Sequence, residues 1–383
     1  MFSIDSIAHL NDKPTPFYFY DLKILNRTIK ELLDASIPYN YHIHYALKAN
    51  CNDEILNHMN IHGIGADCVS GNEVKKALEI GFNANKIVLA GVGKTDKEIN
   101  FAIDNDLFSI NCESIEEILV IDNLAGLKEK CVSIAIRINP NINANTHHHI
   151  TTGLKDNKFG ISINQIPSLI DHVNKLKNIK LVGIHFHIGS QITDFLPFKN
   201  LCETVNQIVK QFKNAGIKLN HLNLGGGLGI DYHNPDTNVI PDFYSFFKLF
   251  NDNLIIDSNI EIHFELGRSI VGQCGTLISK VLFVKKADDT NFIILDAGMT
   301  DLIRPALYQS YHKIENISSK KNNFEKYDVV GPVCESSDCF GKSILLPESH
   351  RNDYVAIRST GAYGEVMSSN YNLREKPLSY FDI

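Results

Sequence analysis

Between residues 41 and 267 the sequence alternates eight times between a short run rich in β-branched residues and a longer segment with apolar residues at helical spacing. Such runs are typical of buried strands, and the segments between them are typical of amphipathic helices. The predicted strands are 41–48, 63–70, 86–91, 108–113, 131–139, 180–189, 221–227 and 261–267. The intervening predicted helices include 71–80, 95–105, 114–124 and 163–177. This alternation predicts a parallel (β/α)8 barrel, with a doubly wound parallel sheet as the alternative.

The pattern changes after about residue 275. Alternating apolar and polar residues without helical spacers, as in 291–299 and 353–360, predict a second domain made of β-strands, either a sandwich or a barrel. The segment FYFYD at 17–21 precedes the barrel and is expected to add a strand to that domain. The predicted domains are a barrel over 22–275 and a β domain formed by 1–21 together with 276–383.

Composition excludes several classes of function. The net charge of −7 and the pI near 6.1 are unlike those of nucleic-acid-binding proteins, which are normally basic. No apolar run approaches the ~18 residues that a membrane span needs, and the N-terminal stretch has no secretory signal pattern. Eight scattered cysteines without a regular spacing suit a reducing compartment. We therefore expect a cytoplasmic protein that binds neither membrane nor nucleic acid.

Lys48 ends the first predicted strand, in the stretch HYALKAN at 44–50. A lysine in that place can pack its stem on the core and extend its ammonium to water. Alternatively, a desolvated amine loses its proton more readily and can attack an aldehyde to form a Schiff base. The heptapeptide leaves both interpretations open.

Polar residues recur at the ends of the other predicted strands. In (β/α)8 barrels the carboxyl ends of the strands carry the chemistry. The residues at these ends are Asp67 and Ser70, Arg137 and Asn139, His185, His187 and Ser190, Gly225, Gly226, Gly227 and Gly229, and Glu265 and Arg268. Together they predict one site. The long polar loop at 140–160 begins at one of these ends and is expected to contribute to it.

The glycines at 225–227 fit a phosphate cup better than a dinucleotide fingerprint, because their spacing is wrong for the latter and they follow the seventh strand. A cup would use backbone amides and the N-terminus of a following helix. A plain glycine turn is the alternative.

His187 could be a core histidine, a metal ligand or a ring that stacks on an aromatic cofactor. The run His147–His149 invites the metal interpretation, but no cysteine or carboxylate stands at ligand spacing. We therefore favour stacking and expect no metal at this site.

The chain resembles the diaminopimelate decarboxylases, pyridoxal-phosphate enzymes of the alanine racemase and ornithine decarboxylase fold type. The motifs that carry this resemblance span nearly the whole chain and are highly specific when taken together. They are HYALKAN (44–50), GADCVSGNE (65–73), RINPNINANTHHHITTGLKDNKFGI (137–161), HFHIGSQI (185–192), LGGGLGIDY (224–232), IRPALY (303–308), GPVCESSDCFG (331–341) and GAYGEVMSSNYN (361–372).

The resemblance implies that Lys48 forms a Schiff base with pyridoxal 5'-phosphate, that His187 stacks on its ring and that Glu265 faces the pyridine nitrogen. A carboxylate there raises the pKa of that nitrogen, and each pKa unit corresponds to about 1.4 kcal/mol of added preference for the protonated form. A protonated ring is the stronger electron sink. The other residues expected to bind the cofactor are Asp67, Ser190, Gly226, Gly227, Arg268 and Tyr363.

The resemblance also implies the roles of the substrate site. Arg268, Arg304 and Tyr308 would bind a substrate carboxylate, with Tyr363 beside them, and Glu335 would take the distal ammonium. Cys334 would donate a proton after carbon dioxide leaves. Cys334 and Glu335 would come from the second subunit of a homodimer.

The implied reaction is the decarboxylation of meso-2,6-diaminopimelate to L-lysine, the last step of lysine biosynthesis. A decarboxylase of carboxynorspermidine or a basic amino acid, and a non-catalytic relative, are the alternatives. A racemase is disfavoured, because racemases place an arginine at the pyridine nitrogen. One departure from the family is Leu266, which replaces the usual proline between Glu265 and Gly267 and predicts weaker preorganisation at most.

Overall fold

The computed structural model describes residues 2–142 and 158–382, so most of the predicted loop at 140–160, with the run His147–His149, lies outside the described residues. The chain forms two compact units that interleave along the sequence. One comprises 29–229 and 242–267, and the other comprises 1–28, 230–241 and 268–383. We call them the barrel unit and the β unit. The bounds predicted from the sequence stay a prediction.

The barrel unit is a closed barrel of eight parallel strands. Its strands are β2 (Tyr41–Ala46), β3 (Gly65–Cys68), β4 (Ile87–Leu89), β5 (Ser109–Cys112), β6 (Val132–Asn139), β8 (Ile179–His185), β9 (His221–Asn223) and β10 (Glu261–Leu266). Each pairs with its neighbour in chain order, and pairing of β10 with β2 closes the ring. A short strand, β7 (Ile161–Ser162), pairs with β6 alone. The predicted (β/α)8 barrel is confirmed.

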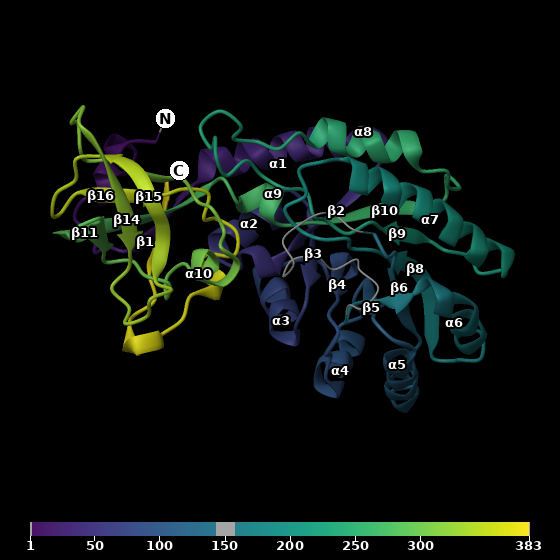
Figure 1. The fold of residues 1–383 in the computed structure, drawn as a ribbon. Coiled ribbons are helices and arrows are strands. Elements are labelled where there is room, and N and C mark those ends of the chain that lie inside the picture. Colours follow the sequence, from purple (N-terminus) through teal and green to yellow (C-terminus); the bar gives the residue numbers. More distant parts are fainter. Residues whose placement is uncertain (1, 143–157, 383) are drawn as a thin grey trace. The chain divides into compact units, whose positions relative to one another are not determined.

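Helices follow the strands, as the sequence predicts. Figure 1 shows α3, α4 and α5 side by side along the outside of the barrel. The helices are α1 (Leu22–Ser36), α2 (Asp53–Ile61), α3 (Gly71–Ile80), α4 (Asp96–Asp104), α5 (Ile115–Leu127), α6 (Ile166–Val173), α7 (Leu196–Asn214) and α8 (Phe243–Asn253). Three of them begin after a serine or threonine whose hydroxyl accepts a backbone N–H of the first turn, namely Ser70, Thr95 and Ser114. These caps fix where each helix leaves the loop above its strand.

The interior of the barrel is unusually polar. Barrels of this kind are normally filled with branched aliphatic side chains, whereas here His44, His221 and His263 are buried. Glycines on neighbouring strands make room for two of these rings: a Cβ at Gly65 would lie 2.6 Å from His44 Nδ1, and one at Gly183 would collide with the His221 ring. The interior is therefore built to hold polar side chains.

The β unit contains an eight-stranded mixed sheet that nearly closes on itself. Its strands are β1 (Phe17–Asp21), β11 (Gly275–Lys286), β12 (Asn291–Leu295), β13 (Ile314–Asn316), β14 (Phe324–Val330), β15 (Cys339–Pro347), β16 (Tyr354–Ile357) and β17 (Leu378–Asp382). β1 pairs with β11 and β17, which confirms that FYFYD joins this domain. Two short helices, α9 (Arg268–Val271) and α10 (Arg304–Tyr308), complete the unit. None of the helices over 2–142 and 158–382 is long and apolar enough to span a bilayer.

Candidate active site

Lys48 lies just past the carboxyl end of β2, in a single 3-10 turn over Leu47–Ala49, rather than in the strand itself. Its Nζ donates to Oδ2 of Asp67 at 3.0 Å. The Asp67 side chain is fully buried, whereas the Lys48 side chain keeps 38% of its surface exposed. A buried carboxyl group therefore holds the amine of Lys48, while the Lys48 side chain remains accessible to a ligand.

Asp67 sits on β3 with one oxygen on Lys48 and the other, Oδ1, buried without a hydrogen-bond partner among the described residues. Burial raises the pKa of this carboxyl, and the negative charge of Glu265 raises it further, against the opposing effect of Lys48. A buried polar oxygen normally has a partner. The Oδ1 atom of Asp67, beside Lys48, is therefore suited to contact a polar group of a bound ligand.

Glu265, on β10, is surrounded by three polar side chains of the barrel interior. Asn223 donates to Oε1 at 2.6 Å and Asn111 donates to the same oxygen at 3.3 Å. Nε2 of His185 lies 2.9 Å from Oε2. Burial alone would raise the pKa of Glu265, but His185 and Lys48 outweigh that effect and hold its pKa below the usual range. Glu265 is therefore a fixed buried anion.

Two of the three neighbours of Glu265, Asn111 and Asn223, were not predicted as site residues. His185 was noted at the end of its strand, but without a role. Asn111 and Asn223 stand inside the predicted strands 108–113 and 221–227. Their alternation with apolar neighbours was a usable signal, because it places them on the inner face of the barrel.

His187 and the glycine turn form the next part of the site. The backbone N–H of Gly226 donates to Nδ1 of His187 at 3.2 Å. Loss of hydration, Arg137 and Lys48 together hold the pKa of His187 well below its usual range, so its ring is neutral at pH 7. Side chains are excluded from this turn, because a Cβ at Gly226 would collide with the carbonyl oxygen of Glu265.

The turn is joined to the loop that carries Ser190. The N–H of Ile192 donates to the Gly227 carbonyl at 2.9 Å, and the N–H of Gly229 donates to the Ile192 carbonyl at 2.9 Å. No helix begins directly after the glycines in the described chain, since α8 starts at Phe243. The expected contribution of a helix N-terminus was therefore wrong, and backbone amides and Ser190 remain as the donors that the turn offers.

In the β unit, Arg268 and Arg304 begin α9 and α10 and are both buried. Nη1 of Arg268 donates to the Tyr232 hydroxyl at 2.6 Å, and Nη2 of Arg304 reaches the same hydroxyl at 3.4 Å. The described hydrogen-bond partners of Arg304 are His312, Tyr232 and Ser310, and none of them is a carboxylate. Buried charges are normally paired, so the guanidinium group of Arg304 favours an anionic ligand. Tyr232 was not predicted.

Tyr363 and Tyr308 complete this group. The guanidinium carbon of Arg268 lies 4.8 Å from the centre of the Tyr363 ring, and that of Arg304 lies 5.9 Å from the centre of the Tyr308 ring. Tyr363 has φ of 58°, a left-handed conformation that is costly outside glycine and concentrates at functional sites. The two rings flank the arginines.

Cys334 and Glu335 lie in the loop between β14 and β15, and both are exposed. The Tyr371 hydroxyl donates to Oε1 of Glu335 at 2.8 Å. The loop is held by the buried Asp338, whose carboxyl accepts the N–H groups of Met299 and Val333 at 2.6 Å and 2.7 Å. Tyr371, like Tyr232, was missed by the sequence reasoning.

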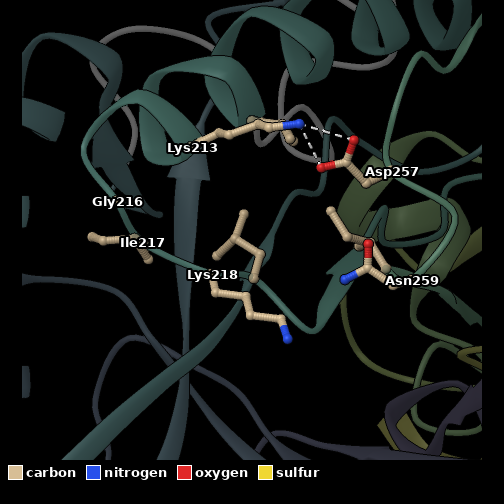
Figure 2. Close-up of a pocket in the computed structure, with 9 residues that line it drawn as sticks. Lys213, Gly216, Ile217, Lys218, Asp257 and Asn259 are labelled. Carbon is tan, nitrogen blue, oxygen red and sulfur yellow. Dashed lines mark hydrogen bonds and ion pairs between the residues drawn. The ribbon is translucent and has the colours of Figure 1, made fainter.

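The predicted residues thus fall into two groups, one in each unit. The barrel unit holds Lys48, Asp67, His187, Ser190, Gly226, Gly227 and Glu265. The β unit holds Arg268, Arg304, Tyr308, Cys334, Glu335 and Tyr363. In the barrel unit the first group gathers at the carboxyl ends of the strands. Figure 2 shows a separate hollow of about 290 Å³ near Lys213 and Asp257. The residues that line it come just before β9 and β10 in the sequence, so it lies at the opposite end of the barrel from Lys48.

Comparison with known proteins identifies the family. A family model described as the pyridoxal-binding domain of pyridoxal-dependent decarboxylases matches residues 22–272, which is more than half of the 383-residue chain. The chain belongs to the pyridoxal-dependent decarboxylases. Its cofactor is pyridoxal phosphate. This confirms the family and the cofactor expected from the sequence.

Relatives within the family are similar over nearly their whole length. The diaminopimelate decarboxylase of Bacteroides thetaiotaomicron is 51% identical over 381 residues, covering 99% of this chain and 98% of the relative. The diaminopimelate decarboxylase of Aquifex aeolicus is 39% identical over 366 residues, covering 94% of this chain and 85% of the relative. The crystal structure of the Helicobacter pylori enzyme complexed with L-lysine has a TM-score of 0.93 at 39% identity, covering 98% and 94%.

The barrel residues of this pyridoxal-dependent decarboxylase fit its cofactor. Lys48 offers an amine, the buried Oδ1 of Asp67 has no described hydrogen-bond partner, and Glu265 offers a carboxyl group whose pKa is held below the usual range. The turn at Gly226 leaves no room for a side chain, as close approach of a phosphate to backbone requires.

Proposed function

We propose that the protein removes carbon dioxide from meso-2,6-diaminopimelate to give L-lysine, with pyridoxal 5'-phosphate bound at Lys48. The observation that carries this proposal is full-length similarity to a diaminopimelate decarboxylase at 51% identity, covering 99% of this chain. The L-lysine in the Helicobacter pylori structure agrees with the proposed product. The reaction belongs in the cytoplasm, where the eight free cysteines would stay reduced.

Pyridoxal phosphate, when bound, supplies an electron sink for the carbanion left by decarboxylation. Glu265 would serve that sink, because its negative charge would favour a proton on the pyridine nitrogen. Asn111, Asn223 and His185 hold the carboxylate in one orientation. The hydrogen bonds from both amides and the contact with His185 favour the charged form of Glu265, as a partner for a cationic nitrogen requires.

Lys48 and Asp67 act as a pair in attaching the cofactor. An amine attacks an aldehyde only after losing its proton. The Asp67 carboxyl lies 3.0 Å away, and burial raises its pKa. It can therefore hold a proton that Lys48 releases, and it keeps the amine in place while the cofactor enters.

Recognition of the substrate falls to the arginines of the β unit. Arg268, Arg304 and Tyr308 bind a substrate carboxylate, and Glu335 binds the distal ammonium. The buried charge of Arg304, without a described carboxylate partner, supports the first assignment. The hydrogen bond from Tyr371 supports the second, because it orients Glu335. Cys334 supplies the proton that replaces the lost carboxyl group.

The protein acts as a homodimer in this proposal, with Cys334 and Glu335 reaching into the site of the partner subunit. Exposure of both side chains in the single chain supports this arrangement. A residue that must reach another chain has to be accessible in its own.

Growth complementation tests the proposed activity in the cell. A bacterium that lacks its own diaminopimelate decarboxylase requires lysine, and expression of this chain is expected to remove that requirement. The Lys48→Ala variant, expressed to the same level, is expected to leave it. Continued dependence on lysine despite soluble wild-type protein carrying cofactor would contradict the proposal.

A further inference from the structure

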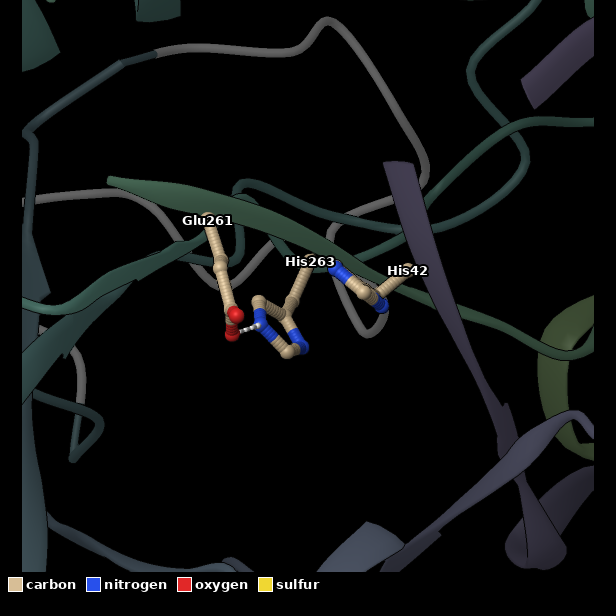
Figure 3. Close-up of side chains that lie close together, drawn as sticks. All are labelled: His42, Glu261 and His263. Carbon is tan, nitrogen blue, oxygen red and sulfur yellow. Dashed lines mark hydrogen bonds and ion pairs between the residues drawn. The ribbon is translucent and has the colours of Figure 1, made fainter. Parts of the chain in front are cut away.

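A cluster of three metal-ligating side chains lies at the amino-terminal end of the barrel, opposite the end that carries Lys48. It consists of His42, Glu261 and His263, which we call the histidine cluster (Figure 3). His42 and His263 are direct partners in the pairing of β2 with β10, and Glu261 is two residues before His263 on the same strand. Side chains two residues apart share one face of a strand, so all three point the same way.

The hydrogen bonds around His263 fix which of its nitrogens carries a hydrogen. Nδ1 of His44 lies 3.2 Å from the carbonyl oxygen of Lys86, and Nε2 of His44 lies 2.8 Å from Nδ1 of His263. A carbonyl oxygen can only accept, so the hydrogen of a neutral His44 is on Nδ1. Its Nε2 is then an acceptor, and Nδ1 of His263 must be the donor.

A neutral His263 therefore has a bare lone pair on Nε2. That atom lies 3.4 Å from Oε2 of Glu261, so a lone pair faces a carboxylate oxygen. Two acceptors in this arrangement repel each other unless a positive charge or a donor lies between them.

The spacing of these atoms suits a metal ion. Zinc lies about 2.0–2.2 Å from nitrogen and oxygen ligands, so two ligands of one tetrahedral ion lie about 3.4 Å apart. The His263 and Glu261 atoms are already 3.4 Å apart. All three donor atoms of the cluster lie within 4.8 Å of one another.

His42 can supply the third ligand. Its ring stacks on His263, with ring centres 4.7 Å apart. Its Nε2 atom is buried and has no hydrogen-bond partner among the described residues. The cluster lines a hollow of about 330 Å³ that also involves His44, Gly63 and Phe108, so an ion has space to enter and the His42 ring has space to turn.

We propose that His42, Glu261 and His263 bind one divalent transition-metal ion of the zinc class. Three ligands leave a position for water. The ion would tie β2 to β10, the two strands whose pairing closes the barrel. Since the amino-terminal face of such barrels serves stability rather than chemistry, we assign the ion a structural role that is independent of decarboxylation.

Titration of the untagged holoenzyme with Zn²⁺, and with Co²⁺ as a spectroscopic probe, tests this site. We expect one strong equivalent per chain, a tetrahedral Co²⁺ spectrum and a higher unfolding temperature with metal. Glu261→Gln and His42→Gln are each expected to weaken binding by about tenfold or more. Decarboxylation should be unchanged in both, which also shows that they fold.

Two control variants make the test specific. Glu54→Gln alters another His and Glu pair, in which His58 Nε2 lies 3.6 Å from Glu54 Oε1, and should bind metal like the wild type. Replacement of His147–His149 by alanine should also preserve the strong site. If Glu261→Gln and His42→Gln bind as tightly as Glu54→Gln, or if the strong site is lost only with His147–His149, the proposal is wrong. Absence of any strong binding by the wild-type protein would also overturn the proposal.

Discussion

Lys48 Nζ lies 3.0 Å from Oδ2 of Asp67, a fully buried carboxyl at the carboxyl end of the adjacent strand. The ammonium is thus paired with a carboxyl group while 38% of the Lys48 side chain stays exposed, and the Schiff-base role of Lys48 remains a prediction. This pairing places the only amine among the predicted site residues where a cofactor aldehyde would be bound. The first prediction concerns this pair.

Lys48→Ala is expected to abolish decarboxylation and the visible absorption band of bound pyridoxal phosphate, because the covalent link is lost. Absorption spectra after desalting measure the effect. Lys76→Ala is a matched control, since Lys76 pairs with Asp53 on the barrel surface, and it should keep both band and activity. A band that survives in Lys48→Ala would refute the assignment.

Glu265→Gln is expected to lower kcat by roughly 10²-fold or more, because it removes a preorganised charge from a water-poor site. Asn111 and Asn223 can still orient the amide, so the variant should fold and bind cofactor. Glu261→Gln lies on the same strand at the other end of the barrel and should keep wild-type kcat. Equal kcat values for the two variants would contradict the role of Glu265.

Mixing two inactive variants tests the shared site. Lys48→Ala and Cys334→Ala are each expected to be nearly inactive, but dimers that form at random after joint refolding should recover about a quarter of wild-type activity. Half of such dimers combine the two variants, and each of these has one intact site out of two. No recovery, although both variants appear in one dimer by sedimentation, would show that Cys334 acts within its own chain.

Stability should fall as the pH drops below about 6.5. The pKa of His44 is lowered to about 4 and that of His221 to about 3, chiefly by burial, and that of His263 is lowered further. Below about pH 6.5 these histidines bind protons in the unfolded chain but stay neutral in the folded protein. Each therefore lowers the free energy of unfolding by an amount on the order of a few kcal/mol.

Asp301 acts in the opposite direction, because burial raises its pKa to about 6, and burial raises the pKa of Asp67 and Glu73 as well. His187 and His312 add to the loss at low pH, because burial lowers the pKa of both rings. Urea unfolding of the whole protein at about pH 7.5 and about pH 5 measures the sum. A midpoint that stays constant or rises toward the lower pH would show that the histidines do not govern acid stability.

Periodicity was sufficient to predict the architecture. Each of the eight predicted strands overlaps one observed barrel strand, because strands buried on both sides are rich in apolar and β-branched residues. FYFYD was predicted to join the β domain, and it pairs with β11 and β17 there. Local composition thus determines the elements and their order.

The surroundings of the site were harder to predict, because they depend on which residues face one another across the barrel. Asn111 and Asn223 are distant in sequence from Glu265, yet both donate to its Oε1. Tyr232 follows the glycine turn in the sequence but contacts Arg268 and Arg304 in the β unit. Such contacts depend on strand register and on which distant parts of the chain meet in the fold, and a single sequence does not reveal either.

Leu266 illustrates a smaller difference. The family proline is replaced by a residue whose backbone continues β10 opposite Tyr45 and whose side chain is fully buried. Strand pairing therefore holds the segment between Glu265 and Arg268 in this chain. The sequence shows the loss of the proline but not the pairing.

Substrate preference tests the central claim most directly. The purified protein with pyridoxal phosphate should release carbon dioxide from meso-diaminopimelate, yielding L-lysine, with a kcat/KM higher than for ornithine, lysine or arginine by about 10⁴-fold or more. A site that pairs arginine with the distal carboxylate leaves that charge unpaired when the carboxylate is missing. Faster turnover of any of these three amino acids than of meso-diaminopimelate would contradict the account.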